Sequence, residues 1–444
     1  MNVMTMHKRF QNKEPIVIGH SKNPVEDLTK ALIYRKEIMF SNRIPFIETY
    51  KHYQRINEED ALAAIRLLLN LDDRLRISTS QIAESYRRLM YMPELQIDIF
   101  EKFWEQQHLL NLLNGVYDIH TMKPTSNWRD CCFDYLLNFS YTPNSKLEDA
   151  PVFKKFVETS LGLENLECLL RSLAYCISSL TKGRKCIVLL GYGQTGKSTL
   201  LNLLESIIPT ELVSHEPFHT MASPQSKAKY PNKRVNISRD NSNYPNRHED
   251  SFKSLISCEM TTGREVYEKS IDFIPALKFI FATNCDLNFA HPDDAVYDRI
   301  VVIPFSKKVP KSMRDPDLDE KLTIEKDTIF SLAVDRLKDL LRSNYDFCMS
   351  DEAQEYLNHR RMLLHTAEIF LKEKTVLDPH GTISSVTLYD VYKDWCSSNG
   401  LPPIGRNEFY HKVRNYSSDI QYKKVDSESG RVNGFHGLRL HDST

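Results

Sequence analysis

Hydrophobic and polar positions along the chain alternate between helical and strand-like spacing. Apolar residues at helical spacing predict helices over residues 61–69, 80–90, 153–180, 318–342 and 351–374. Short apolar runs predict buried strands over residues 187–190, 233–240, 277–284 and 300–305. Since strands and helices alternate downstream of residue 186, we expect an α/β fold there, with a parallel sheet covered by helices.

The pattern also predicts how the chain is divided. We expect a helical N-terminal region over residues 1–149, an α/β core over 150–345, a helical connector over 346–375 and a small domain over 376–444. In the last segment, helices over 388–395 and 406–416 precede a predicted β-hairpin over 420–440, and helices followed by a hairpin predict a winged-helix domain.

One strand leads directly into a glycine-rich loop. The GxxxxGK[ST] pattern is complete, and its residues are Gly191, Gly193, Gln194, Thr195, Gly196, Lys197, Ser198 and Thr199. Backbone N–H groups of such a loop surround phosphate oxygens, the lysine reaches the β- and γ-phosphates, and the serine hydroxyl is a Mg²⁺ ligand. Leucines at helical spacing follow, so a helix N-terminus also faces the anion. The sequence therefore predicts binding of ATP with Mg²⁺.

Hydrolysis requires further polar groups near the phosphates. Asp240 ends the predicted strand over 233–240 and is the candidate for a second acidic residue at Mg²⁺, although Asn236 interrupts that strand and a surface-turn acid is the alternative. Asn284, which ends another strand, is a candidate for hydrogen bonding to the γ-phosphate or its attacking water. Arg299 is a candidate arginine finger, a group that stabilises the charge of a nucleotide bound to a neighbouring subunit.

Composition narrows the possible partners and location. At 444 residues and 51.7 kDa, two or three domains are expected. A net charge of −1 gives no global attraction to nucleic acid, so such binding must be local. Lys423, Lys424 and Arg431 in the C-terminal hairpin are candidates for it, against a solvated face or a protein docking surface. The nine cysteines form no CxxC pair and no stretch reaches membrane-spanning length, so a cytoplasmic protein with reduced thiols is expected.

Several segments together resemble a known family. Residues 111–118, 191–199, 234–240, 257–269, 281–284 and 298–305 are similar, in this order, to motifs of superfamily 3 AAA+ DNA helicases, namely the primase-helicases of phages, plasmids, mobile islands and poxviruses. The resemblance implies a hexameric ring that binds single-stranded and forked DNA. It also implies that residues 257–269 form a DNA-gripping hairpin, with Arg264 and Lys269 as candidate contacts. Asp240 stands where the family usually has glutamate, and Arg299 stands alone where it has two arginines.

The sequence leaves three candidate functions. An ATP-dependent hexameric DNA helicase or replication initiator of a mobile element or phage is favoured, without primer synthesis because the N-terminal region shows no primase motif, so that a separate primase is a possible partner. A nucleotide-switched DNA-binding scaffold, for origin recognition or defence, is the alternative. A phosphate-loop kinase is disfavoured by the predicted winged helix and by the context of Arg299.

Overall fold

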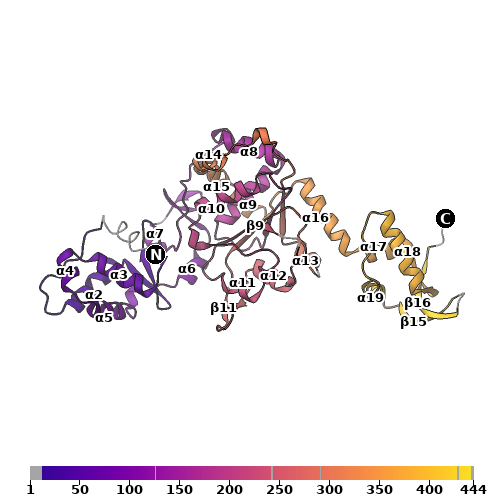
Figure 1. The fold of residues 1–444 in the computed structure, drawn as a ribbon, viewed down its shortest axis with the longest axis horizontal. Helices are drawn as coiled ribbons and strands as arrows, with labels where there is room; N and C mark the ends of the chain where they lie inside the picture. The colour runs from indigo at the N-terminus through magenta and orange to yellow at the C-terminus, as the bar shows by residue number, and fades with distance from the viewer. Residues whose placement is uncertain (1–12, 126, 242–243, 291, 428–429, 442–444) are drawn as a thin grey trace. The chain divides into compact units, whose positions relative to one another are not determined.

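The computed structural model describes residues 13–125, 127–241, 244–290, 292–427 and 430–441, without the side chains of Phe100, Asp240, Met313 and Ser427. The chain forms two compact units. The first combines the chain up to Ala290 with Arg299–Ser350, and the second combines the segment ending at Asp298 with the chain from Asp351 onward. Each unit is described by itself below (Figure 1).

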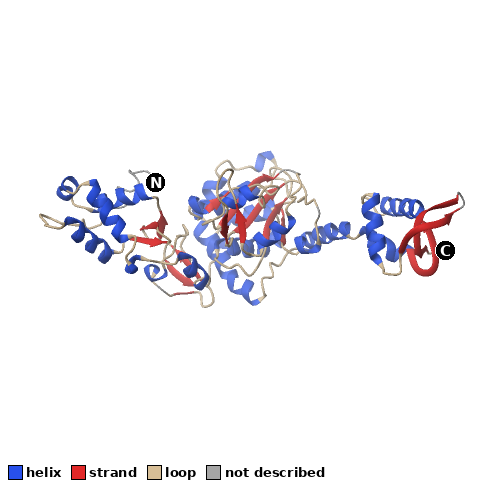
Figure 2. Cartoon of the chain, turned by 90° about the horizontal axis from the view of Figure 1, so that it is seen from below, coloured by secondary structure: helices blue, strands red, loops and turns tan. Residues whose placement is uncertain are grey.

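A five-stranded sheet forms the centre of the first unit. In spatial order its strands are β13 (Ile300–Pro304), β7 (Cys186–Leu190), β12 (Lys278–Thr283), β9 (Val235–Asn241) and β8 (Val213–Ser214). All four neighbouring pairs are parallel. Every residue of β12 and β13 is buried, as expected for a parallel sheet covered by helices on both faces. Figure 2 shows these strands enclosed by helices.

The covering helices come from both sides of the phosphate-loop sequence. They are α8 (Pro151–Ser160), α9 (Leu166–Ile177), α10 (Lys197–Ile207), α11 (Pro224–Ala228), α12 (Glu249–Ile256), α14 (Leu318–Ile324) and α15 (Lys326–Arg342). The helical stretch predicted over 153–180 is thus two helices, α8 and α9, and the helices predicted over 318–342 are α14 and α15. A small antiparallel hairpin, β10 (Thr261–Gly263) with β11 (Ile271–Phe273), lies outside the central sheet.

Strand order decides which residues meet at one edge. β7 lies between β13 and β12, and both neighbours end level with it, because Leu190 is in register with Thr283 and with Pro304. Polar residues that follow β7 and β12 therefore share the carboxyl edge of the sheet. Arg299 precedes β13 and lies at the opposite edge, where its carbonyl accepts a 2.7 Å hydrogen bond from the N–H of Cys186.

The N-terminal region contains more strand than the sequence predicts. Its helices are α2 (Pro24–Arg35), α3 (Glu58–Leu68), α4 (Leu71–Arg76), α5 (Thr79–Leu89), α6 (Ile99–Glu105) and α7 (Trp128–Cys131). Two small antiparallel sheets accompany them: β1 (Ile38–Ser41), β2 (Ile44–Glu48) and β3 (Tyr53–Arg55), and β4 (Leu109–Leu112), β5 (Gly115–Asp118) and β6 (Lys123–Pro124).

The expectation of a helical N-terminal region is corrected accordingly. The turn between β1 and β2 is formed by Asn42 and Arg43, with φ of 50° and 66°. Two-residue hairpin turns of this kind need positive φ at both central residues, and glycine in the sequence usually indicates them. With arginine in the second position and strands of three to five residues, this sheet carries little sequence signal.

The second unit is small and ends in a hairpin. Its elements are α13 (Asp294–Tyr297), α16 (Asp351–Leu364), α17 (Thr366–Lys374), β14 (Thr375–Ser384), α18 (Ser385–Ser398), α19 (Arg406–Tyr416), β15 (Gln421–Ser427) and β16 (Gly430–Leu440). The strands form an antiparallel sheet in the order β14-β16-β15. Thus the two helices and the hairpin predicted after residue 376 form, joined by β14, which the sequence pattern did not reveal.

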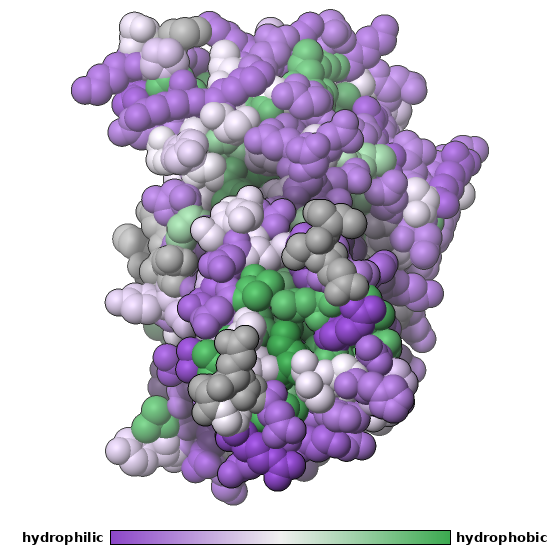
Figure 3. Space-filling view, turned by 90° about the vertical axis from the view of Figure 1, so that its right-hand side faces the viewer, coloured by the Kyte–Doolittle hydropathy of each residue, from purple (hydrophilic) through white to green (hydrophobic). Residues whose placement is uncertain are grey.

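Surface chemistry of the second unit is mostly polar. The exceptions among its described residues include Met362, Leu377, Val386 and Tyr422, each 40–49% exposed. Figure 3 shows hydrophobic side chains gathered among hydrophilic ones on the face that it draws. Across the described ranges of the whole chain, no helix has the length and apolar character needed to cross a membrane.

Candidate nucleotide-binding site

The glycine-rich loop connects the end of β7 to the start of α10, as the sequence predicts. Two of its glycines are required by close contacts. A Cβ on Gly191 would lie 2.1 Å from the carbonyl oxygen of Phe305, and one on Gly196, whose φ is +93°, would lie 2.6 Å from Cε2 of Phe156. A Cβ on Gly193 would have no neighbouring heavy atom within 4 Å, so no close contact requires glycine at this position.

Neighbouring strand ends fix the start of the loop. The N–H of Gly191 donates to the carbonyl of Thr283 at the end of β12, at 3.1 Å, and the N–H of Phe305 donates to the carbonyl of Leu190 at 2.6 Å. The start of the loop is therefore anchored to both neighbours of β7.

Lys197 is folded back onto the loop. Its Nζ donates to the carbonyls of Gly191 at 2.6 Å and Tyr192 at 2.7 Å, and to the hydroxyl of Thr195 at 3.3 Å. These acceptors are neutral, whereas phosphate oxygens are anionic and form stronger charge-assisted hydrogen bonds with an ammonium group. A bound phosphate would therefore compete well for Lys197. Ser198 is exposed on the first turn of α10, where the helix dipole also favours an anion.

The strand that carries Asp240 is regular up to a bulge. Asn236, which interrupts its apolar pattern, is fully buried, and its side chain is satisfied by Ser214 and by the backbone of Glu216. Next to the site the register shifts: Ser238 pairs with Phe281 and Asn241 pairs with Thr283, so that two residues oppose one. Such bulges often adjoin active sites. The backbone of Asp240 lies in this bulge, whereas its side chain is outside the described part of the structure.

Asn241 is a residue that sequence reasoning missed. It is buried, accepts from the N–H of Phe218 at 2.8 Å and donates to the carbonyl of Ala282 at 2.9 Å. These bonds hold the end of β9 against β12, beside which Asn284 is exposed. A polar residue one position past the predicted strand end was the only signal for it in the sequence.

A cavity of about 590 Å³ adjoins the loop. One part of its wall is apolar and is formed by Pro151, Val152, Phe156, Val309 and Leu318. The other part contains the phosphate-loop residues Gln194, Gly196 and Thr199 together with three cationic side chains and one carboxylate, those of Lys155, Arg314, Lys321 and Asp315, of which Lys321 and Asp315 are paired. An apolar wall beside a cationic, amide-rich one matches a nucleoside joined to phosphates. The residues of this cavity come from segments that are distant in sequence, and the sequence pattern did not predict it.

Arg299 does not lie near the phosphate loop of its own chain. It stands at the other edge of the sheet, where its Nε and Nη2 donate to the hydroxyl of Ser257 at 3.2 and 3.1 Å. Arg299 is level with the residue before Cys186, and the loop begins at Gly191, so six residues of strand separate them, or about 20 Å at 3.3 Å per residue. The geometry thus brings Lys197, Ser198 and Asn284 to one edge and leaves Arg299 at the other.

The hairpin expected over residues 257–269 is found over 261–273, where β10 and β11 pair and the tip between them is exposed. Arg264 and Lys269 are exposed, and the Nε of Arg264 donates to the carbonyl of Glu268 at 3.2 Å. Between them, Tyr267 is fully exposed and Val266 is 63% exposed. Exposed apolar and aromatic residues at a hairpin tip were not singled out from the sequence, because in a strand pattern they indicate core positions.

The basic residues expected in the C-terminal hairpin are on its surface. Lys423 and Lys424 are exposed on β15. Arg431, on β16, forms an exposed ion pair with Asp426 at 3.3 Å, so part of its charge is neutralised.

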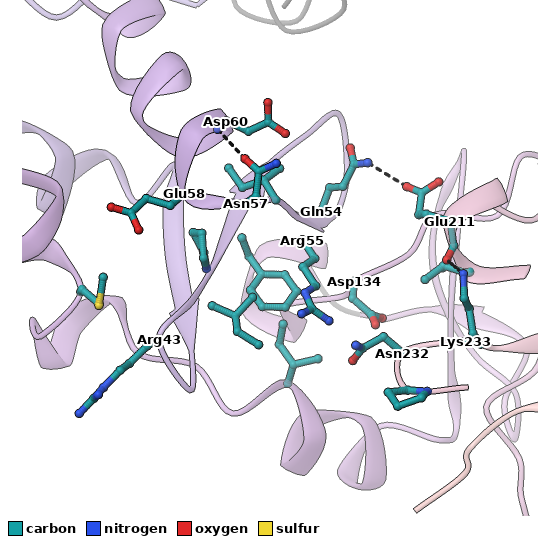
Figure 4. A pocket seen from close by; sticks show the side chains of 18 of the residues that line it. Arg43, Gln54, Arg55, Asn57, Glu58, Asp60, Asp134, Glu211, Asn232 and Lys233 are labelled. Atoms are coloured by element: carbon teal, nitrogen blue, oxygen red, sulfur yellow. Dashed lines mark hydrogen bonds between the residues drawn. The ribbon is translucent and has the colours of Figure 1, made fainter. Parts of the chain in front are cut away.

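A second cavity, of about 880 Å³, contains no residue of the phosphate loop. Residues 43–60 and 211–233 contribute most of its wall, and Figure 4 shows the side chain of Arg55 extending towards Asp134. One of the dashed contacts in the same view joins Gln54 to Glu211 at 3.0 Å. Since no phosphate-binding element reaches it, this cavity does not mark the nucleotide site despite its larger volume.

Comparisons with known proteins address the fold and the family. Residues 34–162 match the family model described as "D5 N terminal like", and residues 189–299 match "Family of unknown function (DUF5906)". A search of the curated proteins finds no match. Apo structures of the NrS-1 C-terminal region are similar, with TM-scores of 0.51 and 0.54 at 13% identity and 0.51 at 12% identity.

These structural matches extend over nearly the whole length of both chains. They cover 92–94% of this chain and 98–100% of the other chains. At this level of identity the likeness shows a common fold, a mixed α/β architecture around a parallel five-stranded sheet. The two family models match separate segments, and each covers less than half of the chain.

Proposed function

We propose that this chain is an ATP-dependent DNA helicase or replication initiator of the superfamily 3 type, and that it works as a ring of identical subunits, with six as the expected number. The observation that carries the proposal is the complete phosphate loop at the β7–α10 junction, beside a cavity with one apolar and one cationic wall. The similarity to the NrS-1 C-terminal region and the D5 N terminal like match support the replication-related part.

Each residue of the site has a proposed task. The loop N–H groups and Lys197 bind the β- and γ-phosphates, and the cavity holds the nucleoside. The hydroxyl of Ser198 and the carboxylate of Asp240 are hard oxygen donors that suit Mg²⁺, which would neutralise phosphate charge when bound with the nucleotide. Asp240 is also the candidate for activating the attacking water, and Asn284 is the candidate for orienting it.

The ring is proposed because of Arg299. An arginine at the opposite edge of the sheet cannot reach the nucleotide of its own subunit, but it can reach one bound by a neighbour if subunits associate edge to edge. ATP would then lie between subunits, with Lys197 on one side and Arg299 on the other.

DNA contacts are proposed at two places. The β10–β11 hairpin offers Arg264 and Lys269 to the phosphates of a single strand. The second unit has the element order of a winged helix, and its exposed Lys423 and Lys424, with Arg431, would contact DNA electrostatically.

The decisive experiment measures ATPase activity with and without single-stranded DNA, and unwinding of a forked duplex. Wild type should show DNA-stimulated hydrolysis and unwinding, and Lys197→Ala should lose both, because the phosphate charge is no longer compensated. Lys22→Ala, an exposed lysine of the N-terminal region, is the matched control and should behave as wild type.

Other outcomes would point elsewhere. DNA binding that depends on ATP but produces no unwinding favours the nucleotide-switched scaffold, for which the Asp240 bulge, in place of a regular strand end, is the supporting observation. Undiminished hydrolysis in Lys197→Ala would refute both proposals, because neither allows the phosphate-loop lysine to be dispensable.

A further inference from the structure

The segment between β13 and α14 is attached to the tip of the phosphate loop. The N–H of Val309 donates to the carbonyl of Gln194 at 3.4 Å. Nη2 of Arg314 donates to Oε1 of Gln194 at 2.6 Å, and its Nε donates to the carbonyl of Val309 at 3.2 Å. Gln194 therefore receives hydrogen bonds from this segment through both its backbone and its side chain.

Arg314 has no acidic partner in the described structure. Its hydrogen-bond acceptors, a side-chain amide and a backbone carbonyl, are both neutral. The adjacent carboxylate, Asp315, is instead bound by Lys321 at 2.5 Å. The guanidinium is exposed and carries its full positive charge at the rim of the cavity.

This charge lies where the phosphate loop and the cavity meet. Arg314, Gln194 and Gly196 line the same space, and the apolar wall formed by residues such as Phe156 and Leu318 lines the rest of it. A nucleoside against the apolar wall would extend its phosphates towards the loop, which is the part of the wall to which Arg314 belongs.

We propose that Arg314 is a nucleotide-contacting residue, which exchanges the side chain of Gln194 for the phosphate chain of a bound nucleoside diphosphate or triphosphate. The inference rests on the proposed function, since it assigns one further ligand group to the same site. Gln194 is the resting partner: its amide oxygen holds the guanidinium close to the loop, and an anionic oxygen replaces it. The guanidinium is charged in both pairings, but its acceptor changes from a neutral amide oxygen to an anionic phosphate oxygen, so the exchange adds the attraction between opposite charges.

The test uses calorimetric titration of the whole chain with ADP and Mg²⁺, in wild type and four variants. Arg314→Ala should bind ADP at least about tenfold more weakly, the effect of losing a hydrogen bond between charged groups. Gln194→Ala should bind ADP several-fold more tightly, because the competing acceptor is gone while the backbone N–H of the loop remains. Lys311 carries the same charge on the same segment but does not line the cavity, so Lys311→Ala should bind ADP with the affinity of wild type.

Arg314→Ala is expected to lower ADP affinity and Gln194→Ala to raise it, and these opposite changes distinguish a ligand contact from a purely structural one. If Arg314→Ala and Gln194→Ala weaken binding equally, the pair only maintains the shape of the loop and the inference is overturned. Unchanged affinity in Arg314→Ala, with a folded protein by circular dichroism, overturns it as well. If wild type itself binds no ADP, the proposed function fails, and the inference fails with it for that separate reason. Partial recovery of affinity in Arg314→Lys would support a contact with phosphate.

Discussion

Replacing Arg299 by alanine tests chemistry and assembly together. In its own chain this arginine lies one residue before β13, at the level of the residue before Cys186, whereas the phosphate loop begins at Gly191. Six residues of strand correspond to about 20 Å. Over that distance a unit charge interacts with another by about 0.8 kcal/mol at an effective dielectric constant of about 20, which corresponds to a factor of about four in rate.

An arginine finger acting on a neighbour has a much larger effect. Such residues contribute about 10³-fold or more to hydrolysis, so Arg299→Ala should bind ATP normally but hydrolyse it about three orders of magnitude more slowly. The two models therefore differ by more than two orders of magnitude. Ser257→Ala, which removes one hydrogen-bond partner of Arg299 within its own chain, is the control and should retain most activity.

The assay is steady-state hydrolysis with single-stranded DNA, followed by a mixing experiment. Arg299→Ala rings keep functional Lys197, and Lys197→Ala rings keep functional Arg299, so mixed rings contain some interfaces with both groups. Partial ATPase activity should return on mixing. A loss of only fourfold in Arg299→Ala, or full activity in a protein that stays monomeric with DNA and nucleotide, would refute the ring. A mixture that stays inactive, although native mass spectrometry shows mixed rings, would contradict independent action of the interfaces.

Three further predictions concern other parts of the chain. Asp240→Asn should bind ATP but lose turnover in a single-turnover assay, and unchanged turnover would mean that another acid activates water. Burial lowers the pKa of Lys278 from 10.5 to about 8, with its ammonium 4.9 Å from the ring of Tyr175. Between pH 8 and 10.5 the unfolded state binds more protons than the folded state, so the free energy of unfolding rises with pH by up to about 3 kcal/mol. Lys278→Met should lose this rise when the free energy of unfolding is measured by chemical denaturation at each pH. Parallel plots of this free energy against pH for wild type and Lys278→Met would contradict the prediction. Arg264→Ala and Lys269→Ala should each lower, by about one, the slope of the logarithm of DNA affinity against the logarithm of salt concentration, and should leave ADP affinity unchanged. Unaltered DNA-stimulated ATPase activity and unwinding in both variants would show that other residues bind the DNA.

Local patterns determined much of this protein from the sequence alone. The phosphate loop is recognisable because its glycines, lysine and serine act within one short stretch between an apolar strand and a helix. Helix positions and the hairpin over 420–440 follow in the same way, since periodicity reports which residues share a face. The hairpin expected over 257–269 came instead from the family resemblance. Short strands such as β1 and β2 were missed, because their turn uses Asn42 and Arg43 in place of glycine.

The tertiary structure alone decided which of these residues meet. Parallel strands place sequence-distant ends at one edge, so Asn284 lies near Lys197, while Arg299, only 15 positions after Asn284, lies at the other edge. The bulge at Asp240 and the cavity between α8 and α14 depend on register and packing, to which no local pattern is sensitive. Arg314 belongs to the same class: nothing in its neighbourhood along the chain distinguishes it, and only folding brings it to Gln194.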